Sequence, residues 1–313
     1  MNYLPRDFIE TQEGLIFAVV DDTIEDGKVL GFLRYGPNGK LTTNAANALL
    51  GESFPVYLHH STRLDADVHA VPITCIRKHH QPRVRVREIM SNPTGDAIEG
   101  KFRRMLKLLT EEGLPADIFG VTGSLLIGRQ GHGSDVDVVV YGRERFFQAL
   151  AKVKALVKVG LLDELDEPAW RDAYDRRGCH LSFEEYLWHE RRKGSMGLIE
   201  GTKFDLALIV EEAKLADQAI WHKTGLAVIK AIVLDDTRAF DQPARYAINH
   251  AKIGEVLSFT QTYAGQAKTG ETIEAGGKLE LSNDGRKRLV VGSSREAQGE
   301  FIRVLCSPIP QSE

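Results

Sequence analysis

The chain has 313 residues, of which 42% are hydrophobic and 27% are charged, and it carries a formal net charge of -4. No stretch is long and apolar enough to cross a bilayer, and Arg6, Asp7 and Glu10 interrupt the start where a secretory signal needs an apolar core. Three scattered cysteines lack the spacing of a zinc site or a disulfide framework. We therefore expect a cytoplasmic chain with no membrane partner, built from two or three compact domains.

Residues 1–90 are expected to form an α/β module. Apolar runs of strand length at 15–20, 29–35 and 68–73 are bounded by Gly, Pro and Asn, and residues 36–39 are typical of a turn. The module ends in the densest basic segment, 77–87, which we interpret as a connector with one positive face. Its cations could bind RNA or another nucleic acid by releasing counterions, whereas a solvated charged surface is the simpler reading; they are Arg77, Lys78, Arg83, Arg85 and Arg87.

Residues 91–240 are expected to form the catalytic domain and residues 241–313 a β-rich module. Helical spacing predicts helices at 97–112, 145–159, 184–192 and 217–232, and apolar alternation predicts strands at 118–121, 136–141 and 203–210. Short runs at 255–259, 272–281, 288–291 and 301–305 predict a small antiparallel module, with a small barrel as one form. The predicted fold class is thus α/β (α+β), a mixed sheet backed by helices between an N-terminal α/β module and a C-terminal β module.

Gly123 and Ser124 follow the predicted strand at 118–121 and open a helix-like turn. A residue without a side chain lets a phosphate approach the backbone N–H groups, and the neighbouring hydroxyl can donate a hydrogen bond. The pair therefore predicts a phosphate-binding turn.

Asp135 and Asp137 begin the next strand, where period-two alternation places both on one face while Val136 and Val138 point into the core. Two carboxylates about 4 Å apart repel each other by about 4 kcal/mol at an effective dielectric of roughly 20, and a divalent cation removes this cost. Oxygen ligands favour Mg²⁺, with Mn²⁺ as the alternative ion. Asp205, on the opposite face of its strand from Phe204, is the candidate third ligand and catalytic acid.

Several further residues near these acids have two readings. Glu200 competes with Asp205 for the third position but precedes Gly201 in a predicted turn. Ser134 either contacts phosphate or caps its own turn. Arg129 and His132 either neutralise the triphosphate or belong to a solvated loop.

A Gly-Ser pair followed ten residues later by Ser-Asp-x-Asp in an apolar strand resembles the signature of the DNA polymerase beta-like nucleotidyltransferase superfamily. Residues 120–124, 134–137 and 141–142 are also similar to a group of predicted nucleotidyltransferases common in archaea, and the likeness extends to 6–11 and 181–190. The resemblance implies a small mixed sheet backed by helices, magnesium dependence and a nucleoside triphosphate such as ATP as donor. It implies no particular acceptor.

The combined expectation is an enzyme that moves a nucleoside monophosphate from a nucleoside triphosphate to an acceptor hydroxyl, with release of pyrophosphate. RNA is one candidate acceptor. Two alternatives stand beside it: a noncatalytic nucleotide-binding or nucleic-acid-binding protein of the same fold, and an AMPylating-type enzyme that modifies another protein.

Overall fold

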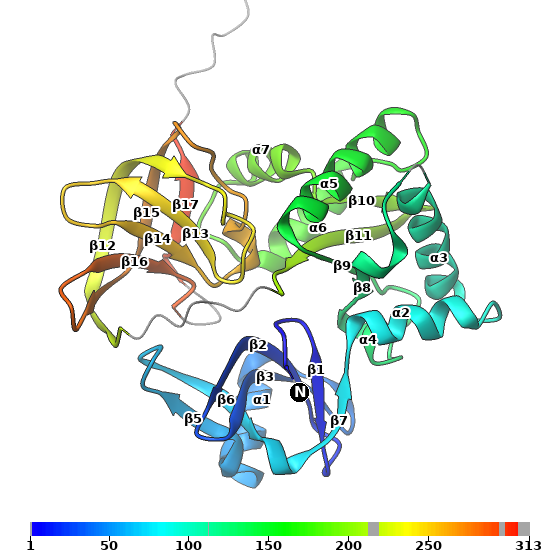
Figure 1. Ribbon diagram of the computed structural model, residues 1–313, viewed down its shortest axis with the longest axis horizontal. Helices are drawn as coiled ribbons and strands as arrows, with labels where there is room; N and C mark the ends of the chain where they lie inside the picture. Colours follow the sequence, from blue (N-terminus) through cyan, green and yellow to red (C-terminus); the bar gives the residue numbers. More distant parts are fainter. Residues whose placement is uncertain (1, 112, 212–218, 294–297, 306–313) are drawn as a thin grey trace, which may run out of the picture. The chain divides into compact units, whose positions relative to one another are not determined.

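The computed structural model describes residues 2–111, 113–211, 219–293 and 298–305 (Figure 1). Within these ranges the chain forms seven α-helices and three β-sheets, which confirms the predicted mixed α/β class. None of the helices in the described ranges is long and apolar enough to span a membrane. The chain divides into two compact units: the first comprises Met1–Ser61, Asp67–Leu165 and Gly194–Ala213, and the second Thr62–Ala66, Asp166–Lys193 and Lys214–Glu313.

The first sheet confirms the predicted N-terminal strands and has the order β5-β6-β3-β2-β1-β7, with β4 paired to β3. Its elements are β1 (Phe8–Thr11), β2 (Ile16–Glu25), β3 (Lys28–Gly36), β4 (Gly39–Lys40), α1 (Thr43–Ser53), β5 (Leu58–Ser61), β6 (Ala66–Pro72) and β7 (Ile76–His80). Alternate residues of β1, β2 and β3, including Ile9, Phe17 and Leu33, meet Leu50 of α1 in one buried cluster. This core joins the N-terminal sheet to α1.

The prediction that residues 77–87 form a connector is wrong, because they lie in β7 and in α2 (Pro82–Ser91). Val86 and Ile89 are buried at helical spacing, and Pro82 occupies the first turn, where a missing N–H costs little. Helix α2 packs against β8 at Gly120, where a Cβ would lie 2.6 Å from the Pro82 Cβ. The apolar residues among the arginines, such as Val86 and Ile89, have the spacing of a helix.

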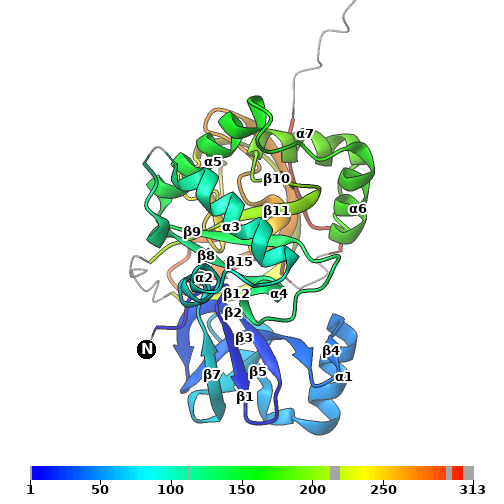
Figure 2. The same cartoon turned by 90° about the vertical axis from the view of Figure 1, so that its right-hand side faces the viewer.

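The second sheet has the order β10-β11-β9-β8 and confirms the strands predicted around the acids. This part of the chain contains α3 (Ala97–Thr110), β8 (Phe119–Val121), α4 (Gly123–Leu126), β9 (Val136–Tyr141), α5 (Arg143–Lys158), β10 (Met196–Ile199) and β11 (Thr202–Ile209). Strands β9 and β11 are parallel, whereas β8 and β10 run antiparallel to their neighbours. Helices α3 and α5 pack against β9 and against each other (Figure 2). Phe204, Leu206 and Leu208 are buried at alternate positions of β11, so this strand has one fully apolar face.

The second unit contains α6 (Glu167–Arg177), α7 (Phe183–Lys193) and the third sheet. The strands are β12 (Trp221–Asp235), β13 (Ala244–Asn249), β14 (Glu255–Ser258), β15 (Thr272–Ser282), β16 (Lys287–Val291) and β17 (Phe301–Val304). Their pairings run β12-β13-β14-β16-β15 and return to β12, which closes five strands into a small barrel, while β17 pairs with β15 (Figure 1, yellow to red). Four of these strands match the runs predicted for the C-terminal β module.

The prediction of a helix at 217–232 is wrong, because residues 221–235 form strand β12. Residues 217 and 218 lie outside the described residues. Ile229, Ala231 and Val233 are buried in turn while the residues between them are exposed, which is the period of a strand. The β-branched residues of this run favour a strand as well. Pairing with β15 along most of the length of β12 overrode the helical reading.

Candidate active site

Asp137 and Asp205 lie side by side on neighbouring strands. Strands β9 and β11 are parallel, and Asp205 is the register partner of Asp137. Partners in adjacent strands project from the same face of a sheet, and Asp135 shares that face because it precedes Asp137 by two residues. Val136 and Val138, on the other face, are buried in the core. The sequence predicted that the aspartates lie on one face of β9 and the valines on the other, and the structure shows the same alternation.

The three carboxylates interact electrostatically. The pKa of the half-buried Asp137 is raised to about 6, by burial first and then by the negative charges of Asp205 and Asp135, against the lowering effect of the positive charges of Lys203 and Arg6. Lys203 also forms an ion pair with Asp135, with 2.8 Å between Nζ and Oδ2. This face, called the acid face below, carries the negative charges of Asp135, Asp137 and Asp205. The positive charges of Lys203 and Arg6 partly offset them.

The Gly123 turn is built against Asp137. Gly123 has a φ of +64°, and a Cβ at this position would lie 2.2 Å from the Asp137 Oδ2. The Thr122 N–H donates to the Asp137 carbonyl at 2.9 Å, so the turn and the acid strand are tied together by their backbones. Only glycine combines this left-handed conformation with this closeness to a carboxylate.

The rest of the loop is held by contacts within the protein. The Ser134 Oγ accepts from the Gly131 N–H at 2.9 Å, which is the capping alternative considered for this residue. The guanidinium of Arg129 donates to the Gly36 carbonyl at 3.1 Å and lies over the Tyr35 ring. The Ser124 carbonyl accepts from the Arg129 N–H at 3.0 Å. These contacts fix the loop that joins the turn to the acids.

Glu200, the competitor for the third acid, lies away from Asp137 and Asp205. It occupies the turn between β10 and β11 with a φ of +48°, and its carboxylate pairs with the Arg104 guanidinium. Asp205 is thus the acid of this hairpin that shares a face with Asp137.

The comparisons with known proteins give one clear relationship. No model of a known protein family matches the chain, and no solved structure matches it. Uncharacterized protein MJ1086 of Methanocaldococcus jannaschii is 34% identical over an alignment of 333 positions, which covers 96% of this chain and 98% of that protein. The chain belongs to the family of MJ1086. The match spans the sequence of both units.

Two positively charged residues that interact with the acids were not predicted from the sequence. Lys203 lies two residues before Asp205 on the same strand face, so the alternation that selected Asp205 could have found it. Arg6 is more than a hundred residues from the acids along the chain, and only the tertiary fold brings its charge to Asp137.

The basic segment is largely engaged with the protein itself. Arg77 pairs with Glu10. Arg83 lies 3.6 Å from the centre of the Tyr141 ring, and Arg85 donates from Nε to the Leu125 carbonyl at 3.0 Å, at the end of the Gly123 turn. Additional acidic partners are Glu211 for Arg83 and both Glu88 and Glu99 for Arg85. Lys78 and Arg87 are exposed.

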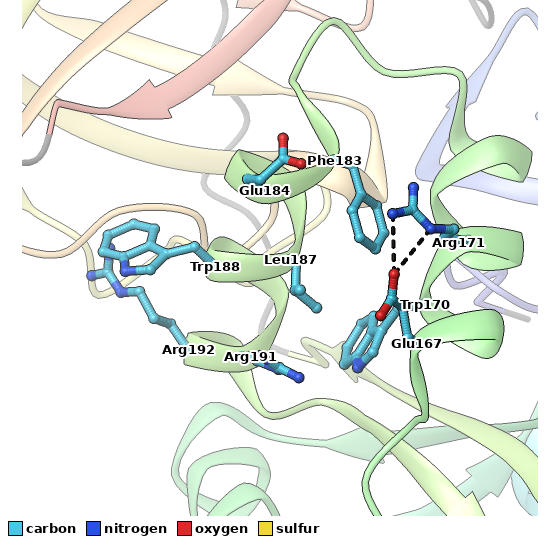
Figure 3. Close-up of a pocket in the computed structure, with 9 residues that line it drawn as sticks. All are labelled: Glu167, Trp170, Arg171, Phe183, Glu184, Leu187, Trp188, Arg191 and Arg192. Atoms are coloured by element: carbon cyan, nitrogen blue, oxygen red, sulfur yellow. Dashed lines mark hydrogen bonds and ion pairs between the residues drawn. The ribbon is translucent and has the colours of Figure 1, made fainter.

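A groove with a volume of about 720 Å³ lies between α6 and α7 in the second unit (Figure 3). Arg171 lies over the Phe183 ring and also bonds Glu167, and Arg192 lies over the Trp188 ring. The residues that line it supply aromatic faces and paired charges, but no strand acids beside a glycine turn. The groove therefore differs in composition from the face that carries Asp137 and Asp205.

The donor set of the acid face fits a hard divalent cation, because three carboxylates supply only oxygen. In the described ranges no three or more His, Cys, Asp or Glu side chains are already gathered as a metal-binding group. Asp135 instead forms an ion pair with Lys203. A cation would have to take the place of Lys203 at that carboxylate.

Proposed function

We propose that this protein is a magnesium-dependent nucleotidyltransferase that moves a nucleoside monophosphate from a nucleoside triphosphate to an acceptor hydroxyl. The observation that carries the proposal is the clustering of Asp135, Asp137 and Asp205 on one sheet face against the left-handed turn at Gly123. Carboxylates kept together at a cost to stability are typical of functional sites. The likeness of the Gly-Ser and Asp-x-Asp pattern to the polymerase beta-like superfamily supports the same reaction.

Each residue has a role in this proposal. Asp135, Asp137 and Asp205 would hold Mg²⁺, which when bound supplies positive charge to the triphosphate and lowers the pKa of the acceptor hydroxyl. The backbone N–H groups of the turn at Gly123 and Ser124 bind the β- and γ-phosphates. Lys203, which pairs with Asp135, would supply positive charge beside the phosphates.

The reaction is an in-line displacement at the α-phosphorus. The acceptor oxygen forms a bond to this phosphorus, the bond to the bridging oxygen of the β-phosphate breaks, and pyrophosphate leaves with the electron pair. We assign Asp205 as the group that assists removal of the acceptor proton. The nucleotide and the acceptor must approach from the acid face, because α3 and α5 pack on β9.

The test is transfer of label from each α-³²P nucleoside triphosphate with Mg²⁺, with and without total RNA or a protein extract. The wild type and Glu200→Gln should both release pyrophosphate and label an acceptor, whereas Asp137→Asn should do neither. Glu200 is the matched control, because it is an acid at the end of the same hairpin and pairs with Arg104 instead.

The labelled product also separates the alternatives. Label on RNA supports a nucleic-acid acceptor, and label on a polypeptide supports an AMPylating enzyme. Tight binding of the triphosphate with no label on any acceptor and no pyrophosphate would favour the noncatalytic nucleotide-binding protein.

A further inference from the structure

The N-terminal turn lies on the acid face of the second sheet. Leu4 packs against an apolar cluster on β9 and β11. The cluster consists of Val139, Tyr141, Ala207 and Ile209, which continue the alternation of Asp137 and Asp205 along the two strands. Leu4 therefore covers the apolar end of the face whose polar end carries the acids.

Buried contacts fix this turn. Asp7 is 2% exposed, and its Oδ2 accepts from the Leu4 N–H at 3.0 Å and lies 2.7 Å from the His79 Nε2. The Tyr3 ring packs on the His79 ring, with 4.7 Å between their centres. Strand β7 thus anchors both sides of Arg6, and the backbone of the turn has little freedom.

Arg6 itself has a strained backbone. Its φ of +79° lies in the left-handed region, which side chains other than Gly, Asn and Asp rarely adopt. Its N–H donates to the Val19 carbonyl at 3.1 Å, and its carbonyl accepts from the Thr122 Oγ1 at 2.8 Å. A glycine would relieve this strain, so the Arg6 side chain is present at a cost to stability.

Thr122 connects this strained residue to the site. Its hydroxyl bonds Arg6, its N–H bonds the Asp137 carbonyl, and it directly precedes Gly123. The Arg6 backbone is thus held at the residue that directly precedes the Gly123 turn. Phosphates bound at that turn would lie within reach of the Arg6 side chain.

We propose that Arg6 is a substrate-binding residue that holds the phosphates of the nucleoside triphosphate, so that the N-terminal module completes the active site. The inference rests on the proposed function and adds the residue that recognises the triphosphate. A guanidinium forms two parallel hydrogen bonds with phosphate oxygens, which a lysine cannot do. Two other roles are a counterion for Asp137 alone and a structural lock for the turn.

The experiment measures binding of a non-hydrolysable α,β-methylene nucleoside triphosphate and of the matching monophosphate, both with Mg²⁺, by calorimetry. The variants are Arg6→Ala, Arg6→Gly and Arg6→Lys in the full chain, with Arg145→Ala on α5 as the control; Arg145 is exposed and bonds Gln148. Thermal midpoints without ligand accompany each titration.

We expect Arg6→Ala and Arg6→Gly to weaken triphosphate binding by about tenfold or more, with unchanged binding of the monophosphate. Arg6→Gly should melt above Arg6→Ala, because both lack the guanidinium but glycine accepts the left-handed φ. Arg6→Lys should lose several-fold in affinity, because the forked geometry is gone. Arg145→Ala should behave as the wild type in every measurement.

Equal triphosphate binding by the wild type and Arg6→Ala would overturn the inference, and so would a change in Mg²⁺ affinity alone, which indicates a counterion. If the Ala and Gly variants fail to fold, full triphosphate affinity of Arg6→Lys overturns it as well. A wild type that binds no triphosphate contradicts the proposed function instead, so the two failures are distinguishable.

Discussion

Asp137 and Asp205 are register partners on the parallel strands β9 and β11, and the charge of Asp205 raises the pKa of Asp137. A pair of like charges in adjacent strands destabilises a sheet. The fold holds the pair nonetheless, with the core residues Val138 and Leu206 on the opposite face of the same strands. The site is therefore expected to lose activity and gain stability when one charge is removed.

Asp137→Asn should make the metal-free protein more stable at pH 8. The pKa of Asp137 is raised from 3.8 to about 6, so its contribution to stability is present below about pH 4 and is lost as the pH rises through 6. Removing the charge should raise the free energy of unfolding by about 1 kcal/mol after allowance for solvent screening. Urea unfolding at pH 8 with EDTA measures it, and a less stable variant would contradict the account.

Mg²⁺ should stabilise the wild type but not Asp137→Asn. A ligand that binds only the folded state raises the thermal midpoint, and the rise grows with the logarithm of the ligand concentration above its Kd. The measurement is a thermal scan over a series of Mg²⁺ concentrations, with Glu200→Gln as the variant that should respond like the wild type. Identical responses of Asp137→Asn and the wild type would place the ion elsewhere.

Gly123→Ala should lower kcat/KM by about 100-fold, because the Asp137 carboxylate must shift away from the added Cβ. The left-handed φ should also cost about 1 to 2 kcal/mol of stability. Gly131→Ala is the matched control in the same loop, since nothing lies within 4 Å of a Cβ there. Steady-state kinetics and urea unfolding of both variants test this, and equal losses in the two would be inconsistent with a specific turn.

Lys203→Gln should bind Mn²⁺ more tightly than the wild type in the absence of nucleotide, by about threefold to tenfold, because a competing positive charge is removed from Asp135. Lys107→Gln, an exposed lysine of α3, should bind as the wild type does. Titration of the Mn²⁺ paramagnetic resonance signal gives both affinities. Weaker binding by Lys203→Gln would mean that Lys203 positions Asp135 instead of competing for it.

The second unit should lose stability as the pH falls from 6.5 to 4. Burial lowers the pKa of His189 from 6.5 to about 4; its Nδ1 lies 2.6 Å from the Glu185 carbonyl and its Nε2 accepts from the Val304 N–H at 3.1 Å. In this range the unfolded chain binds a proton that the folded chain excludes, at a cost of about 2 to 3 kcal/mol. Urea unfolding followed by tryptophan fluorescence should show this slope, flattened in His189→Gln and retained in His222→Gln.

Local sequence patterns predicted the strands of the second sheet that carry Asp137 and Asp205. Strand alternation placed Asp137 and Asp205 correctly on one face, and Gly123 was correctly expected to open a helix-like turn after a strand. Both predictions depend only on periodicity and on the absence of a side chain, which neighbouring elements do not change. The reaction itself is a proposal that these patterns motivate.

Long-range packing determined what the sequence did not predict. The arginines of 77–87 suggested a polyanion surface, yet Arg83 stacks on Tyr141 and Arg85 supports the Gly123 turn, contacts that join distant segments. The prediction of a helix at the place of strand β12 was wrong, because a short stretch of sequence does not show that this segment pairs with β15. Arg6 enters the site through Thr122, and no spacing in the sequence relates those two residues.

The most direct test is the anomalous diffraction of Mn²⁺ in crystals grown with a non-hydrolysable nucleoside triphosphate. The account predicts an anomalous peak coordinated by Asp137 and at least one of Asp135 and Asp205, with the triphosphate along the Gly123 turn and Lys203 released from Asp135. A peak away from these acids, or a triphosphate bound at another place while the ion pair between Lys203 and Asp135 persists, would contradict it.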